Sequence, residues 1–202
     1  MLAHYQGNVW SAADPARSLG VSEPTVRRYL DLLTDLLLVR QLPPWQENLA
    51  KRQVRSPKVY VRDSGILHSL LGIKDQRDLL THPKCGGSWE GFVIESVLSI
   101  VDPDASYFWS THQGAELDLL LIVGSKRIGI EIKRADVPRV SRSMHIALED
   151  LHLDHLAVIY PGTRQYPLGP KMTAVPFEQA VSSPRALLGG IRRGVRRTQA
   201  PR

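Results

Sequence analysis

The spacing of apolar residues changes near residues 55–65, and this change predicts two structural units. Between Thr25 and Val39, apolar residues recur every three or four positions, which is typical of an amphipathic helix. Beyond the change, short apolar runs of strand length alternate with helical patterns, which indicates an α/β domain. We therefore expect a small N-terminal module over 1–56, an α/β domain over 57–182 and a basic, disordered tail over 183–202.

The N-terminal module has the pattern of a helix-turn-helix. A short helical segment over 11–19 is followed by Gly20, and the Ser22 hydroxyl can cap the next helix by accepting a first-turn amide. Helix, glycine turn and capped helix are the elements of this motif. The segments 38–42 and 51–55 can supply two wing strands and their basic loop, so the pattern predicts a winged helix.

A winged helix can read DNA or pack against another domain, and both interpretations have support. DNA reading would bring Arg27 and Arg28 to the major groove and basic wing residues to the phosphates. Those wing residues are Lys51, Arg52 and Arg55. Against this, Leu32, Leu36 and Leu38 make the second helix apolar on most sides, which favours burial against another domain.

The second unit predicts a fixed order of elements. Its first helix follows Ser88 and has an apolar face with helical spacing. The later elements are a strand over 107–110, a hairpin around Gly124-Ser125, a helix over 141–151 and a strand over 155–160. The predicted order is helix, three strands, helix, strand.

The hairpin carries three charged residues. With Gly124-Ser125 as its loop, Asp118 lies opposite Glu131; with the loop one residue later, Asp118 lies opposite Lys133. Side chains alternate along a strand with period two, so either register brings the three charges to one face. A bulge would separate them.

Two carboxylates and a lysine on one face have a chemical use. Paired carboxylates can hold Mg²⁺ or Mn²⁺, which prefer oxygen ligands. The metal polarises a phosphoryl oxygen and lowers the pKa of a bound water, while the lysine positions the nucleophile or stabilises negative charge. The structural interpretation, in which the three charges neutralise one another on an exposed hairpin, stays open.

Asp118, with Glu131-Ile-Lys133 after a hairpin, resembles the Asp…Glu-X-Lys signature of the PD-(D/E)XK nuclease-like superfamily. Three longer stretches resemble the C-terminal region of a prokaryotic ATPase family, in which a winged helix and a domain called DUF4143 follow an AAA+ domain. Those stretches are 56–66, 89–95 and 107–118. The resemblance covers roughly residues 5–180.

This resemblance implies an αβββαβ fold, like the order predicted above, and a helix-borne carboxylate that completes the metal site. On a helical wheel, Glu90 lies at the edge of the apolar stripe and Glu95 points away from it. Glu90 is therefore expected to assist Asp118 and Glu131, the metal ligands, with Lys133 at the nucleophile. A first-turn glutamate favoured by the helix dipole is the alternative for Glu90.

The chain lacks the Gly-x4-Gly-Lys-Ser/Thr phosphate loop of such ATPases, so we expect no ATP site in it. The resemblance then implies the C-terminal part of such a protein or a truncated relative. An AAA+ ATPase domain is expected as its partner, in cis or in trans.

Composition adds a few constraints. Among 202 residues Cys85 is the single cysteine, which argues against a disulfide framework or a cysteine zinc site. No run approaches the ~20 apolar residues of a membrane span, so we expect a cytoplasmic protein without membrane contact. The net charge is +6, but five arginines lie within residues 191–202 of the tail, so charge gives little support to nucleic-acid binding.

Three functional interpretations follow. The first is a Mg²⁺-dependent nuclease acting on DNA through Glu90, Asp118, Glu131 and Lys133. The second is a module of an AAA+ ATPase that binds nucleic acid or a partner without catalysis. The third is a purely structural assembly domain.

Overall fold

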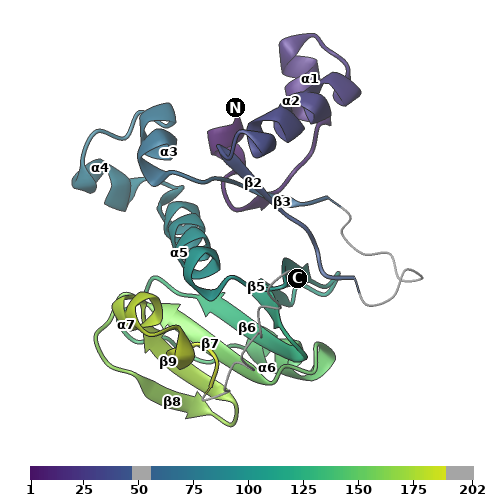
Figure 1. Cartoon of the computed structure of the whole chain (residues 1–202). Helices are drawn as coiled ribbons and strands as arrows, with labels where there is room; N and C mark the ends of the chain where they lie inside the picture. The colour runs from purple at the N-terminus through teal and green to yellow at the C-terminus, as the bar shows by residue number, and fades with distance from the viewer. Residues whose placement is uncertain (47–55, 190–202) are drawn as a thin grey trace, which may run out of the picture.

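The chain folds into a small helical module followed by a six-stranded mixed sheet with helices on both faces (Figure 1). The computed structural model describes residues 1–46 and 56–189. The predicted α/β fold class is confirmed.

The N-terminal module combines two helices with a three-stranded antiparallel sheet in the order β1-β3-β2. Its elements are η1 (Leu2–Tyr5), β1 (Asn8–Val9), α1 (Ala13–Leu19), α2 (Glu23–Asp35), β2 (Val39–Leu42) and β3 (Lys58–Val61). Apolar side chains of α1 and α2 pack with Trp10, Val39 and Val59 into one core cluster.

The predicted turn and cap between the two helices are confirmed. Helix α1 ends at Gly20, whose φ of +66° suits a residue without a Cβ atom. The Ser22 hydroxyl accepts a hydrogen bond from the Thr25 amide at 3.3 Å, and Pro24 occupies the first turn of α2.

Two details of this module differ from the prediction. Helix α2 ends at Asp35 rather than continuing to Val39, because Leu37 turns the backbone to a φ of +59° and Val39 begins β2. The strand that pairs with β2 is β3, although the predicted module ends at residue 56. The segment 51–55 lies outside the described residues.

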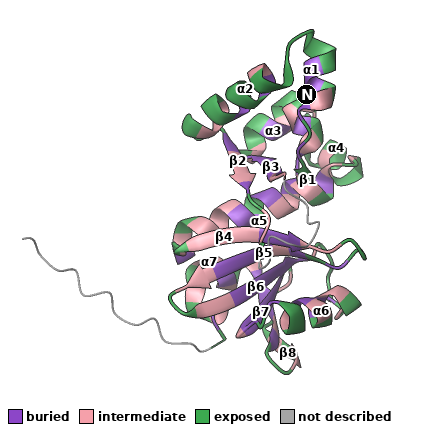
Figure 2. Cartoon of the chain, turned by 90° about the vertical axis from the view of Figure 1, so that its right-hand side faces the viewer, coloured by how far each residue is buried: buried purple, intermediate pink, exposed green. Residues whose placement is uncertain are grey.

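Helix α2 and the turn that follows it expose several apolar side chains among charged ones, and Figure 2 shows this part of the module as largely exposed. Leu36 is 60% exposed, and Tyr29, Leu32, Leu37 and Leu38 are also exposed. The expectation that another domain buries this helix is not met within residues 1–46 and 56–189.

Three helices lead from the module to the sheet: α3 (Ser64–Leu70), α4 (Gln76–Thr81) and α5 (Cys85–Val101). Helix α5 begins three residues before Ser88, where the apolar pattern predicted its start.

The first turn of α5 packs closely on the N-terminal segment, since a Cβ at Gly87 would lie 2.9 Å from the Gln6 carbonyl oxygen. The Gln6 side chain also accepts from the Val61 amide at 2.7 Å and donates to the Gly87 carbonyl at 3.3 Å. The module and α5 are therefore joined by direct backbone contact.

The large sheet has the strand order β4-β5-β6-β7-β9-β8. Its elements are β4 (Ala105–Ser110), β5 (Glu116–Val123), β6 (Lys126–Ile132), α6 (Arg142–Asp150), β7 (His155–Tyr160), β8 (Tyr166–Gly169), β9 (Met172–Pro176), α7 (Phe177–Ser182) and η2 (Pro184–Ala186). Strands β6, β7 and β9 are parallel, and the remaining pairs are antiparallel. From α5 to β7 the order is αβββαβ, as predicted.

Two apolar cores sandwich this sheet. On one face, α5 and α7 pack on Leu119, Ile130 and Ile159. On the other face, α6 covers Leu117, Leu156 and Val158 with its Met144 and Ala147. Helix α5 thus lies between the N-terminal module and the sheet (Figures 1 and 2). Its Glu90 lies at their junction, where it contacts Lys58 and Tyr60 of β3.

Candidate active site

The hairpin of β5 and β6 has the first of the two predicted registers. Gly124 and Ser125 form the loop, since Val123 pairs with Lys126 and Leu119 with Ile130. Gly124 has a φ of +60°, as a tight two-residue connection requires. This register directs Asp118 towards Glu131.

Strand β5 contains an irregularity at Asp118. Its pairing with β4 shifts between Trp109 and Tyr107, so three steps from Leu117 to Leu120 match two steps of β4. Such a bulge re-aims a side chain. The Asp118 carboxylate accepts a hydrogen bond from the Ile132 amide at 2.7 Å, so the bulge does not separate it from β6.

Glu131 and Lys133 form a close ion pair at the end of β6. The Lys133 ammonium lies 2.6 Å from Glu131 Oε1, and the Glu131 side chain is only 6% exposed. Its second oxygen, Oε2, is buried without a hydrogen-bond partner among the described residues. Burial, and after it the charge of Asp118, raise the pKa of Glu131 to about 7, although the charge and hydrogen bond of Lys133 lower it.

Glu90 joins this group from α5. Its Oε1 accepts a 2.5 Å hydrogen bond from the Tyr60 hydroxyl and lies 3.6 Å from the Lys58 ammonium. Burial raises the pKa of Glu90 to about 7, and the Asp118 charge acts in the same direction. Burial also raises the pKa of Asp118. The four predicted residues therefore belong to one electrostatic group; their roles stay predictions.

Sequence reasoning missed Lys58 and Tyr60, which β3 contributes to this group. Every residue of β3 is buried, and Lys58 Nζ also lies 5.5 Å from the centroid of the Phe108 ring. Burial lowers the pKa of Lys58, but the charges of Glu90 and Asp118 outweigh it and the pKa is raised. The sequence did contain a signal for Lys58: it is the one charged residue in a short strand of otherwise apolar and aromatic residues.

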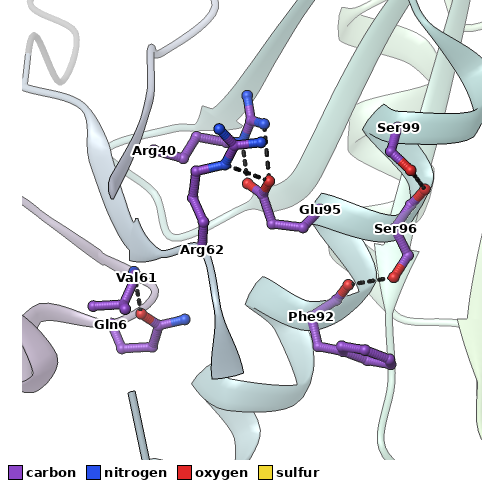
Figure 3. A network of polar contacts seen from close by, with 8 residues as sticks. All are labelled: Gln6, Arg40, Val61, Arg62, Phe92, Glu95, Ser96 and Ser99. Carbon is purple, nitrogen blue, oxygen red and sulfur yellow. Dashed lines mark hydrogen bonds and ion pairs between the residues drawn. The ribbon is translucent and has the colours of Figure 1, made fainter. Parts of the chain in front are cut away.

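Glu95 lies on another side of α5, where it pairs with two arginines of the N-terminal module (Figure 3). Its carboxylate receives Arg40 of β2 and Arg62, with Arg62 Nε at 2.7 Å and Arg40 Nη2 at 3.0 Å. An open cleft of about 640 Å³ borders this fork. Two arginines on one carboxylate tie α5 to the N-terminal module at a second point.

The predicted nucleic-acid contacts lie apart from the carboxylate group. Arg27 pairs with Glu23 on the exposed surface of α2, at 3.5 Å, and Arg28 is exposed one residue further. Helix α2 lies on the side of the module that faces away from the large sheet (Figures 1 and 2). Lys51, Arg52 and Arg55 lie outside the described residues.

No group of three or more His, Cys, Asp or Glu side chains in the described parts of the chain has the arrangement of a metal site. Cys85 is buried and forms no disulfide. No helix within 1–46 or 56–189 is long and apolar enough to span a membrane.

Two domain families match the chain. Residues 1–77 match the domain of unknown function DUF8612, and residues 85–180 match the domain of unknown function DUF4143. No solved structure matches.

Two mycobacterial proteins are similar over nearly the whole chain. Uncharacterized proteins of Mycobacterium tuberculosis and Mycobacterium bovis are each 52% identical over 183 residues, which is 91% of this chain. The same alignment covers 42% of each relative, so the chain spans less than half of their length. The two family matches follow one another along the chain, and the DUF4143 match agrees with the resemblance seen in its motifs.

Proposed function

We propose that this chain carries a nuclease-like site in which Asp118 and Glu131 hold one Mg²⁺ or Mn²⁺ ion for phosphodiester hydrolysis of DNA. One observation carries the proposal: Glu131 is buried, and its Oε2 has no hydrogen-bond partner in the described structure. A buried carboxylate oxygen without a partner is costly, and a divalent cation satisfies it.

The donor set fits this ion. Magnesium is usually held by one or two carboxylates together with waters and substrate phosphate oxygens, so a preformed cage of three side chains is not required. When bound, the ion supplies Lewis acidity towards a phosphoryl oxygen and a bound water. Asp118 and Glu131 converge as such a pair, since the hairpin register places them opposite each other and Asp118 accepts a hydrogen bond from the amide next to Glu131, that of Ile132, at 2.7 Å.

Lys133 and Glu90 have chemistry suited to the remaining roles. The Lys133 side chain is 38% exposed, so its ammonium can reach a substrate phosphate while it contacts Glu131. Glu90 has a pKa of about 7, and a carboxyl with that pKa can give or take a proton near neutral pH. Glu90 therefore assists at the side of the site that faces the N-terminal module.

We also propose that the chain acts together with an AAA+ ATPase domain, in cis or in trans. The resemblance of the motifs supports this association, and the two relatives are more than twice as long as the matched region. The exposed apolar residues of α2 are suited to contact with a protein. No ATP site is proposed in this chain.

The alternative is a binding module without catalysis. Its support is the internal pairing of the charges, with Lys133 at 2.6 Å from Glu131 and Lys58 at 3.6 Å from Glu90. Charges that satisfy one another stabilise a junction without a metal. Such a module would bind DNA with an affinity that falls steeply with salt, and it would not cut it.

A calorimetric titration with Mn²⁺ tests the proposal, with plasmid and single-stranded DNA cleavage measured on the same samples. Wild type is expected to bind and cut, whereas Asp118→Asn and Glu131→Gln lose both metal heat and cleavage. Glu149→Gln, which changes an exposed acid on α6, is the matched control and is expected to behave as wild type. No metal heat in wild type, or cleavage that survives in Asp118→Asn, would reject the catalytic proposal.

A further inference from the structure

Strand β3 brings two side chains to the same carboxylate oxygen. Lys58 and Tyr60 are two residues apart, so they leave the strand on the same side. The Tyr60 hydroxyl donates to Glu90 Oε1 at 2.5 Å, and the Lys58 ammonium lies 3.6 Å from that atom. Glu90 thus receives one neutral donor and one full positive charge from the N-terminal module.

The position of the Lys58 ammonium is fixed. Its residue pairs with Val9 on one neighbouring strand and with Leu42 on the other, so the backbone is held on both sides. The side chain is only 10% exposed, and the Phe108 ring lies 5.5 Å from Nζ. A buried ammonium held in this way cannot turn out into solvent without breaking these contacts.

This ammonium also interacts electrostatically with the proposed metal-binding pair. The charges of Glu90, Asp118 and Glu116 all act on Lys58, while Lys133 contacts Glu131 on β6. In two-metal nucleases and phosphatases, the ions lie about 3.5–4 Å apart and divide the site carboxylates between them. Here the carboxylate from α5 is already neutralised by a cation of the chain itself.

We propose that Lys58 takes the place of a second divalent ion, so that Asp118 and Glu131 bind one ion and Glu90 binds none. This inference rests on the proposed function, because it concerns the metal stoichiometry of the same site. Glu90 then keeps its proposed assisting role without binding metal, and Lys58 of the module balances its charge. The N-terminal module thereby determines how many ions the nuclease-like site takes.

The stoichiometry of Mn²⁺ binding, measured by calorimetry and by electron paramagnetic resonance on the full chain, tests the inference. Wild type is expected to bind one ion with the spectrum of an isolated Mn²⁺. Lys58→Met is expected to bind two, with the broadened spectrum of a spin-coupled pair, and Lys58→Met combined with Glu90→Gln is expected to return to one. Lys126→Met removes an exposed lysine that pairs with Asp154 and serves as the control, with one ion expected.

A second measurement does not depend on the folding of the Lys58 variant. Glu90→Gln in the wild-type background is expected to change Mn²⁺ affinity by less than about threefold, whereas Asp118→Asn lowers it by more than about tenfold. Two ions in wild type, one ion in a folded Lys58→Met, or a tenfold loss in Glu90→Gln would overturn the inference, while metal binding by Asp118 and Glu131 would still stand. Absence of Mn²⁺ binding in wild type and in Lys58→Met would overturn the proposed function and the inference with it.

Discussion

The Tyr60 hydroxyl donates a 2.5 Å hydrogen bond to Oε1 of Glu90, and the two residues lie in segments that match different domain families. Tyr60 lies on the middle strand of the N-terminal sheet, and Glu90 lies on the helix that packs on the large sheet. The candidate active site is therefore built across the junction of the two units.

Tyr60→Phe is expected to lower the free energy of unfolding by about 1–3 kcal/mol, because a buried carboxylate loses a donor while the ring is kept. Chemical denaturation measures the difference. Tyr29→Phe, at a tyrosine that is 56% exposed, is the control and is expected to leave stability unchanged. Equal stability of the two variants would show that the hydrogen bond to Glu90 contributes nothing.

Two adjacent glycines of α5 make a matched pair for testing the contact with the N-terminal segment. A Cβ at Gly87 would lie 2.9 Å from the Gln6 carbonyl oxygen, whereas a Cβ at Gly86 meets nothing within 4 Å. Gly87→Ala is expected to cost about 1–3 kcal/mol of unfolding free energy, and Gly86→Ala to raise it by up to about 1 kcal/mol through helix propensity. Thermal melts of both variants decide this, and a stabilised Gly87→Ala would contradict the close approach.

Glu95→Gln is expected to lower the free energy of unfolding by about 1–3 kcal/mol, because Arg40 and Arg62 lose their shared carboxylate charge. The control is Glu23→Gln, which breaks the exposed pair with Arg27 and should change stability by less than about 0.5 kcal/mol. Urea unfolding of both variants measures the contrast. If the two losses are alike, the fork at Glu95 is no stronger than a surface pair.

The metal-free protein is expected to lose stability as pH rises from about 4.5 to about 7, through its buried glutamates. Glu131 has a pKa of about 7 in the fold against an ordinary 4.5, so the folded state binds its proton more tightly than the unfolded state. Its contribution is present below the unfolded pKa and disappears as pH rises through the folded one.

Glu131→Gln should therefore remove roughly 1–3 kcal/mol of this pH dependence. Burial lowers the pKa of His155, which gives an opposite slope, so the difference between wild type and variant is the quantity to measure. Unfolding free energies at several pH values, without metal, provide it. Parallel curves for the two proteins would contradict the raised pKa of Glu131.

Local rules were sufficient to predict much of the fold. The apolar pattern and the period of two limited the hairpin to two registers, of which the structure has the first, and Ser22 predicted the start of α2. Strands β8 and β9 were not predicted, because Pro167 and Gly169 give the shorter one the pattern of a turn. The sequence did not predict the bulge near Asp118, because no local signal gives its position.

The partners of Glu90 could not be predicted from spacing. Lys58 and Tyr60 precede Glu90 by thirty residues or so, and they meet it only because the N-terminal sheet packs on α5. The exposed apolar residues of α2 and of the turn after it are the opposite case. Its pattern predicted burial, yet periodicity reports where apolar residues lie around a helix and not what covers them.

Strand β3 also determines where a fragment of this protein can begin. The DUF4143 match begins at residue 85, so a fragment made to that boundary would leave Glu90 and Glu95 without any of their four partners. Those partners are Arg40, Lys58, Tyr60 and Arg62. A chimaera that exchanges the N-terminal module would therefore have to keep these four residues to satisfy the two glutamates of α5.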